Sequence, residues 1–240
     1  MDGELQVHHA IIYNTHDGIR DINFFSEGVS QALGINSAGQ IVGFGRSNPR
    51  SDFNHAVIYS NGAAQDLGPG TANGVSDAGA VVGAMSIDSP GHQHAFLYSD
   101  GKMKDLGTLG GPNSRALAVN NDRVVVGSSD TDIQGHFHAF IFDTDKGMRD
   151  LGSLAPTPSL SAAFGINSSG DIVGWTGTDN KGGFGAFIYH DGNMQDLNTM
   201  ISSDSGVHLD VAKAINDAGQ IAAYGIVGRQ SHAFLLTPKH

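Results

Sequence analysis

The chain has no cysteine and almost no glutamate. Only Glu4 and Glu27 are glutamate among its 24 acidic residues, whereas glycine occurs 34 times in 240 residues. Without cysteine, disulfide scaffolds, thiol catalysis and cysteine-ligated zinc are excluded. Glutamate and lysine cover helix surfaces, whereas glycine and aspartate favour turns. The composition therefore disfavours a helical bundle and favours strands joined by turns.

Basic residues and long apolar runs are also scarce. Lysine and arginine together number 13, so the formal net charge is −11 at pH 7. This charge repels nucleic-acid phosphates and anionic lipids, and no run of about 18 apolar residues is present. We therefore expect no nucleic-acid partner and no membrane insertion. Residues 1–9 also lack the charged start and the apolar stretch of a signal peptide.

Two short patterns alternate along the chain. One is a turn followed by apolar residues, as in GINSAGQIVG from Gly34, and it occurs five times. The other is a His-Ala-Phe-like run such as HAFLY from His94, which occurs six times and is followed in five cases by Asp-Leu or Asp-Ile. Successive alanines of this run are 46, 39, 44, 47 and 47 residues apart, namely Ala10, Ala56, Ala95, Ala139, Ala186 and Ala233. We expect residues 1–240 to form a single domain of five repeats of about 46 residues.

Each repeat predicts four short strands in two hairpins. Ala95 to Tyr98 and Met103 to Leu106 are apolar runs separated by Ser-Asp-Gly, a sequence typical of tight hairpin turns. Such repeats predict an all-β fold, a five-bladed β-propeller of four-stranded antiparallel blades. A solenoid of stacked hairpins is the competing interpretation, but its ends would need polar caps. The sixth His-Ala-Phe-like strand is surplus, and it is either an extra edge, a docking arm or a dimer contact.

The segment HAFLYSDGKMKDLGTLGGPNSRALAVNNDRVVVG, which begins at His94, resembles the His-Ala-Phe (HAF) repeat family of extracellular bacterial proteins. The likeness extends over nearly the whole chain. It departs from the pattern at Gly185, which replaces the histidine, at Ser76, which replaces the turn asparagine, and by one missing residue near Asp122. The resemblance implies the repeat fold and an extracellular or periplasmic location. It transfers no catalytic residue, ligand or cofactor.

Strand order decides which loops share a side. Turns inside the hairpins lie on one face, and the longer connections between hairpins lie on the opposite face. These connections vary in length and content, and variable loops on a rigid scaffold commonly carry recognition sites. We therefore expect the ligand on the face of the longer connections.

The candidate residues are those that the repeat does not explain. Trp175, the only tryptophan, is expected at the start of a variable loop, where it either stacks on a sugar or protein ligand or packs against a neighbouring repeat. The arginines on this face are suited to clamping a carboxylate, and His92 and His136 each lie two residues before a repeated histidine. The ligand-binding candidates are Trp175, His92, His136, Arg46, Arg115, Arg229 and His208.

The repeated histidines and aspartates are better explained as structural residues. A residue present once in each repeat more often bonds its own loop or the next repeat than performs chemistry. The Asp130 loop resembles the start of a calcium site but has Ile141 where a bidentate glutamate is needed. We predict no metal and no cofactor, and no catalytic residue is assigned.

Three functions are compatible with this pattern. We favour a non-catalytic ligand-recognition module that binds a glycan or a protein through the variable loops. The alternative is an enzyme of hydrolase or lyase type with a single His/Asp site at the mouth of the central channel, drawing on residues such as Asp52, Asp130 and Asp179. A scaffold within a larger surface protein is the third, because fold alone does not rank functions.

Overall fold

The computed structural model describes residues 8–25, 28–46, 53–88, 91–154, 159–177 and 183–239. Its regular structure consists of antiparallel strands and two short 3-10 helices, η1 (Leu197–Thr199) and η2 (Ser203–Ser205). In the described part of the chain, no helix is long and apolar enough to cross a bilayer. The all-β prediction is therefore confirmed.

The strands follow one another in chain order within each sheet. An N-terminal hairpin contains β1 (Ile11–Asn14) and β2 (Gly18–Asp21). Unit 1 contains β3 (Val29–Ile35), β4 (Ile41–Arg46), β5 (His55–Ser60) and the first half of β6 (Ala63–Val75). Unit 2 contains the second half of β6, β7 (Val81–Ser86), β8 (Gln93–Ser99) and β9 (Lys102–Asp105).

The other three units have separate sheets. Unit 3 contains β10 (Gly110–Val119), β11 (Val125–Thr131), β12 (Phe137–Asp143) and β13 (Gly147–Gly152). Unit 4 contains β14 (Leu160–Ile166), β15 (Ile172–Gly177), β16 (Phe184–His190) and β17 (Asn193–Asp196). Unit 5 has only three strands, β18 (Val207–Ile215), β19 (Ile221–Val227) and β20 (Gln230–Leu236).

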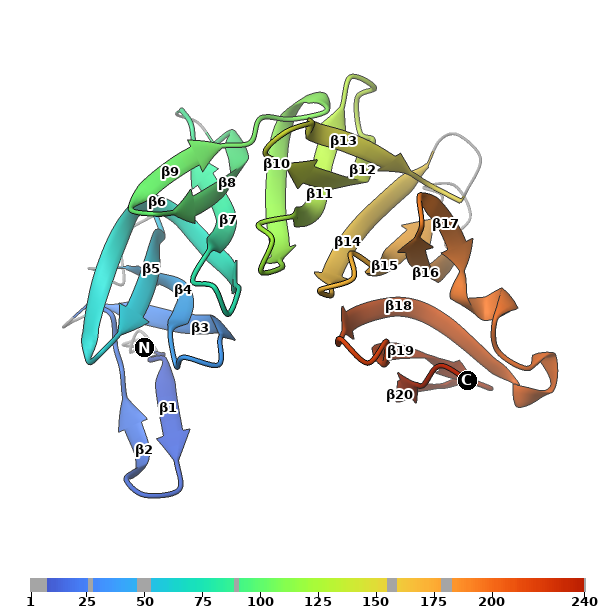
Figure 1. Ribbon diagram of the computed structural model, residues 1–240, viewed down its shortest axis with the longest axis horizontal. Coiled ribbons are helices and arrows are strands. Elements are labelled where there is room, and N and C mark those ends of the chain that lie inside the picture. The colour runs from blue at the N-terminus through green and yellow to red at the C-terminus, as the bar shows by residue number, and fades with distance from the viewer. Residues whose placement is uncertain are drawn as a thin grey trace, which may run out of the picture.

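The units stand side by side along an open arc, with the N-terminal hairpin at one end and unit 5 at the other (Figure 1). The expectation of a closed five-bladed ring is not confirmed. The two ends are incomplete in different ways, because the hairpin corresponds to the last two strands of a unit and unit 5 to the first three. Among the described strands, β1 pairs only with β2, and β20 pairs only with β19.

Local sequence explains the hairpins. Asp100 and Gly101 have φ angles of 53° and 73°, the left-handed pair that a two-residue hairpin turn requires. A second rule concerns the glycine that units 1 to 4 share in their second strand. A Cβ on Gly174 would lie 2.0 Å from the carbonyl oxygen of Ala162 on the first strand, so no other residue fits there. The same close approach occurs at the equivalent Gly43, Gly83 and Gly127, whereas unit 5 has Ala223 at this position and makes a similar approach two residues later, at Gly225.

The core lies between neighbouring units. The phenylalanines of the His-Ala-Phe runs, Phe96, Phe140 and Phe187, have no exposed surface. Between units 2 and 3, Phe140 packs with Leu97 and Val125 in one cluster. Burying such a side chain contributes about 1.5–3 kcal/mol. Because both sides of each inner sheet are covered, the units hold one another in place and the connecting loops lie on a rigid support.

We name the two sides of the arc by their connections. The turn face carries the turns at 36–39, 76–79, 120–123, 167–170 and 216–219, and the loop face carries the longer connections between hairpins.

Candidate functional site

The turn face is a polar ladder that joins successive units. The backbone N–H of Ser37 donates to Asp77 Oδ1 at 2.8 Å, and that of Ser168 donates to Asp217 Oδ1 at 2.9 Å. Between units 2 and 3, Ala78 N–H donates to Asn121 Oδ1 at 3.0 Å. Each bond therefore ties a turn to the next unit, which gives these side chains a structural task.

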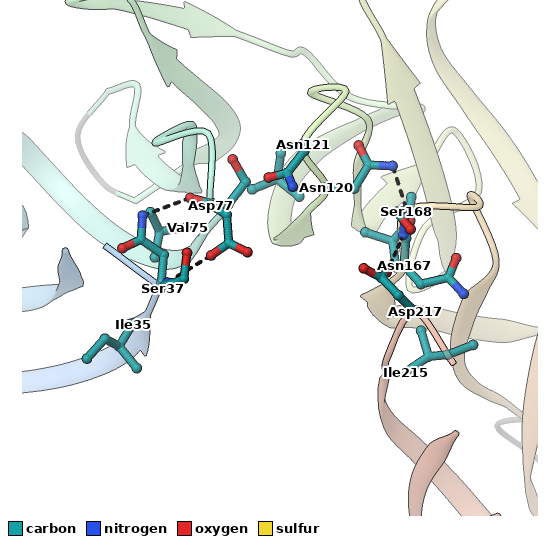
Figure 2. A pocket seen from close by; sticks show the side chains of 14 residues that line it. Ile35, Ser37, Val75, Asp77, Asn120, Asn121, Asn167, Ser168, Ile215 and Asp217 are labelled. Atoms are coloured by element: carbon teal, nitrogen blue, oxygen red, sulfur yellow. Dashed lines mark hydrogen bonds between the residues drawn. The ribbon is translucent and has the colours of Figure 1, made fainter. Parts of the chain in front are cut away.

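A cavity of about 220 Å³ lies at the centre of these turns, with Asp77 and Asp217 on opposite sides of it (Figure 2). The N–H groups of Ser37 and Ser168 lower the pKa of Asp77 and of Asp217 respectively. The negative charge of Asp77 has the opposite effect and raises the pKa of Asp217, because the two carboxylates repel each other. This cavity was not predicted from the sequence, because the turns that line it are nearly constant and the variable connections lie on the loop face.

Four histidines of the repeated run make the same contact on the loop face. In each case the ring Nδ1 donates to the aspartate of the following strand, as in His55–Asp66 at 2.8 Å and His94–Asp105 at 2.9 Å. The aspartate also accepts a backbone N–H two residues further on, for example that of Gly107. The other pairs are His9–Asp21 and His138–Asp150. These contacts agree with the structural interpretation of the repeated residues.

A cavity of about 270 Å³, lined by seven polar residues and Phe137, opens on the loop face beside β8, β10, β11 and β12. Arg115 lines it, is exposed, and makes no ion pair or hydrogen bond within the described part of the chain. Asp130 also lines it and is held by the Asn113 amide, which donates to Asp130 Oδ2 at 2.9 Å. Asn113 is itself fixed, because its Oδ1 accepts the N–H of Gln93 at 3.1 Å. The ring of Phe137 forms an apolar part of the wall.

Phe137 begins a row of aromatic side chains that crosses from unit 3 to unit 5. The Trp175 ring contacts Phe137 edge-on, with centroids 5.9 Å apart, and contacts Phe184 in the same manner at 5.0 Å. Phe184 is 45% exposed. The Nε2 of His208 lies 2.9 Å from the Phe184 carbonyl oxygen and ends the row. We call Phe137, Trp175, Phe184 and His208 the aromatic row.

The structure corrects one detail of the prediction for Trp175. The residue lies inside strand β15 and not in a loop, opposite Ala162 and Ala186. Its ring is half-buried, since small alanines on both flanking strands leave room for it to be covered by the two phenylalanines. The aromatic row therefore packs between units and also exposes aromatic surface to solvent.

The remaining candidates are scattered. Arg46 Nε donates to Asn54 Oδ1 at 2.6 Å, and His92 pairs with Asp88 at 3.3 Å. Arg229 is exposed in the β19–β20 turn, remote in sequence from the cavity. His136 lines a different cavity, beside His138. Asp52 and Asp179 lie outside the described residues.

The alternative prediction was an enzyme with a single site of His and Asp side chains. Within the described ranges, no group of three or more His, Cys, Asp or Glu is arranged to hold a metal ion. Arg115, Trp175 and His208 are the candidates that the fold joins through Phe137 and Phe184. Asn113, Phe137 and Phe184 were missed. The two phenylalanines had a visible signal, since each precedes the histidine position of its repeat where other repeats have polar residues.

A family model described as "Protein of unknown function (DUF3466)" matches residues 27–234. The chain belongs to the DUF3466 family. Among curated proteins, none matches this DUF3466 chain.

Two solved structures resemble the chain in fold, at low sequence identity. TolB from Acinetobacter baumannii is 15% identical, with a TM-score of 0.56 over 94% of this chain and 59% of the TolB chain. The β-propeller domain of the trilobed protease from Pyrococcus furiosus is 12% identical, with a TM-score of 0.49 over 86% of this chain and 82% of that domain. The similarity to TolB shows that the DUF3466 chain has a β-propeller type of fold, and the chain spans 59% of the TolB chain, which is less than two thirds.

Proposed function

We propose that this chain is a ligand-recognition module that binds a glycan on its loop face. The observation that carries the proposal is the junction of the Arg115 cavity with the aromatic row at Phe137. A pyranose ring presents hydroxyl groups to planar polar side chains and an apolar C–H face to aromatic rings. This junction offers both kinds of partner on one rigid surface.

The polar side chains of the cavity are held in place before a ligand arrives. Asn113 and Asp130 are fixed by hydrogen bonds to each other and to the Gln93 backbone. A ligand therefore loses little affinity to the ordering of these groups. The cavity, at about 270 Å³, lies just below the size of about 300–1,000 Å³ that holds drug-sized ligands, which suits a single sugar unit of a longer chain.

Arg115 determines the expected preference among glycans. Its guanidinium has no internal partner in the described part of the chain, although the protein carries a formal net charge of −11. A guanidinium binds a carboxylate through two parallel hydrogen bonds. We therefore infer that glycans containing uronic acid bind more tightly than neutral glycans of the same length.

The experiment is titration with neutral and uronate oligosaccharides, followed by calorimetry and by the emission of Trp175. Because Trp175 is the only tryptophan and contacts Phe137, its emission should shift when the cavity fills. Arg115→Ala should weaken uronate binding at least about tenfold, as expected for loss of a charge-assisted pair.

Arg229→Ala is the matched control, since Arg229 is also exposed and unpaired within the described residues but lies in the β19–β20 turn. The proposal fails if the folded protein binds no member of the panel, or if Arg229→Ala weakens binding as much as Arg115→Ala.

A further inference from the structure

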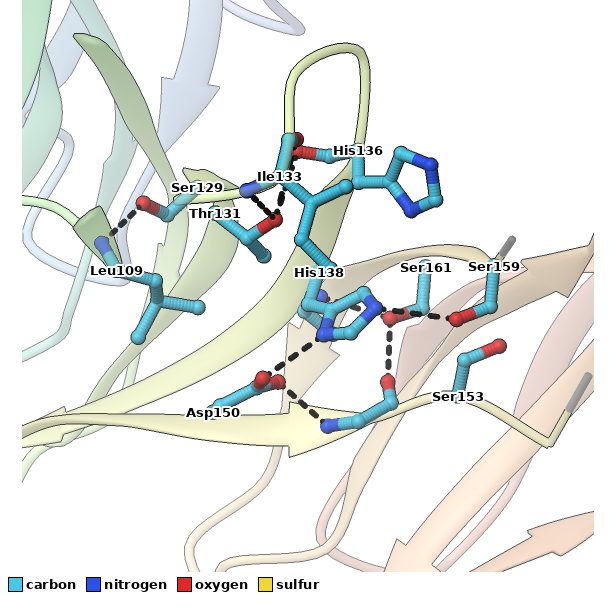
Figure 3. Close-up of polar contacts among 12 residues, drawn as sticks. Leu109, Ser129, Thr131, Ile133, His136, His138, Asp150, Ser153, Ser159 and Ser161 are labelled. Atoms are coloured by element: carbon cyan, nitrogen blue, oxygen red, sulfur yellow. Dashed lines mark hydrogen bonds and ion pairs between the residues drawn. The ribbon is translucent and has the colours of Figure 1, made fainter. Parts of the chain in front are cut away.

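The His138–Asp150 pair differs from its counterparts in one respect: the second nitrogen of its ring contacts a hydroxyl group. His138 Nδ1 lies 2.8 Å from Asp150 Oδ2, and His138 Nε2 lies 3.2 Å from the hydroxyl oxygen of Ser159 (Figure 3). His55 and His94 make the aspartate contact, but within the described part of the chain their Nε2 atoms form no hydrogen bond with a side chain. A serine, a histidine and an aspartate are therefore joined in series in unit 3 and at the start of unit 4.

The proton positions follow from the partners. A carboxylate only accepts, so His138 Nδ1 carries the proton that it donates to Asp150, and Nε2 is free to accept the Ser159 hydroxyl proton. Asp150 is held in place, because its Oδ1 accepts the Gly152 N–H at 2.6 Å. In the N-terminal hairpin, the Asn23 amide lies 3.2 Å from His9 Nε2, which is consistent with an accepting Nε2 in this pair as well.

Ser159 is not part of the repeated framework. Six residues before the small residue of the first strand, the other units have Gly28, Gly68, Pro112 and His208. The serine that the framework does use is Ser161, whose hydroxyl accepts the Ala139 N–H at 2.8 Å and donates to the Gly152 carbonyl. Ser114 makes the equivalent bonds one unit earlier. The packing of the units thus accounts for Ser161 and leaves Ser159 unexplained.

The three side chains line a common cavity of about 230 Å³. Ser159 is 6% exposed, and the side chains of His138 and Asp150 are 19% and 44% exposed. Leu109 and Ile133 give the cavity an apolar part, and His136 lines it too. The ring of His136 has no hydrogen-bond partner in the described part of the chain, so it can offer an N–H to a substrate carbonyl oxygen.

We propose that Ser159, His138 and Asp150 form a nucleophilic site that hydrolyses small carboxylic esters. His138 Nε2 removes the Ser159 hydroxyl proton as Oγ bonds to the ester carbonyl carbon. The intermediate collapses with cleavage of the ester C–O bond, and the leaving alkoxide takes the proton from His138. Water then attacks the acyl-serine with His138 again as base, which releases the carboxylic acid and restores Ser159. This activity goes beyond glycan recognition and uses a separate cavity.

The first test is covalent labelling with a fluorophosphonate probe and peptide mapping by mass spectrometry. Ser159 Oγ should displace fluoride from phosphorus and carry the label. Hydrolysis of p-nitrophenyl acetate should fall at least about 100-fold in Ser159→Ala. Asp150→Asn should also slow hydrolysis strongly, because an amide can hold the wrong tautomer of His138.

The repeats supply a matched control. His94→Ala removes the equivalent His–Asp contact from unit 2, where no serine of the described residues bonds to the ring. It should leave ester hydrolysis unchanged while costing comparable stability. Circular dichroism verifies that each variant folds. Labelling elsewhere, wild-type rates in Ser159→Ala, equal losses in His94→Ala and His138→Ala, or no hydrolysis by the folded protein would each overturn the proposal. The glycan titration and the hydrolysis assay report on different cavities, so failure of the glycan proposal is separately visible.

Discussion

The turn face and the loop face are built from the same repeats but use their polar side chains differently. On the turn face, Asn36, Asn120 and Asn167 are buried and bond within their own turn and to the next unit. On the loop face, Arg115 and the ring of His136 have no internal partner in the described residues. A polar group already satisfied by its neighbours has little to offer a ligand, whereas an unpaired one does. The polar groups of the turn face therefore hold the units together, whereas the unpaired groups of the loop face are those on which the proposed recognition depends.

The largest effect should come from removing a buried asparagine of the turn face. Asn167 donates to Asp171 Oδ2 and the Asn216 carbonyl, and accepts the Asp171 N–H at 2.8 Å. Asn167→Ala should lower the free energy of unfolding by about 2–3 kcal/mol, because buried partners lose their bonds. Urea denaturation measures this loss in the free energy of unfolding. Asn113→Ala on the loop face is the control, with an expected loss of about 1 kcal/mol or less; equal losses would end the distinction between the faces.

The second-largest effect should be a loss of stability in acid, through the aspartates of the turn face. Asp77 and Asp217 have a lowered pKa in the folded protein because each accepts a serine N–H. Their contribution to the free energy of unfolding is therefore fully present above the ordinary aspartate pKa of 3.8. It is lost as the pH falls through the lower pKa of the folded protein. Asp77→Asn should fold, since Asn121 makes the same type of bond with an amide.

The free energy of unfolding is measured from about pH 2 to about pH 6, a range that brackets the ordinary aspartate pKa. The wild type should lose stability more steeply with acid than Asp77→Asn or Asp217→Asn. Parallel curves would show that these contacts do not couple folding to protonation.

The smallest effect concerns a repeat that has lost its histidine. Gly185 stands at that position in unit 4, and a Cβ there would have its nearest neighbours, Asn198 Nδ2 and Asp196 Oδ1, at 3.9 Å. Gly185→His should stabilise the protein by about 0.5–1 kcal/mol through reduced backbone entropy and a His–Asp pair with Asp196. Gly185→Ala isolates the backbone contribution. If histidine is no better than alanine in thermal unfolding, the pair adds nothing to cohesion.

Much of the framework was predictable because its causes are local. The Asp100-Gly101 turn and the apolar run before it identify a hairpin without any knowledge of the rest of the chain. The repeated His94 and Asp105 were interpreted as structural residues because they recur, and they bond each other. The site was harder to predict. Arg115 and Trp175 were named, but the Phe137 ring that joins them was not, because edge-to-face contact between units depends on how the sheets pack.

The sequence by itself determined the repeat, the antiparallel hairpins and the division into two faces, since a turn motif and an alternating strand pattern act over a few residues. Only the tertiary structure decided that the described strands form an open arc, because the angle between units comes from side-chain packing across their interfaces. It also decided that Ser159 approaches His138, which is 21 residues earlier in the chain and belongs to another unit. Contacts of this kind depend on how whole sheets meet, and no local pattern encodes that.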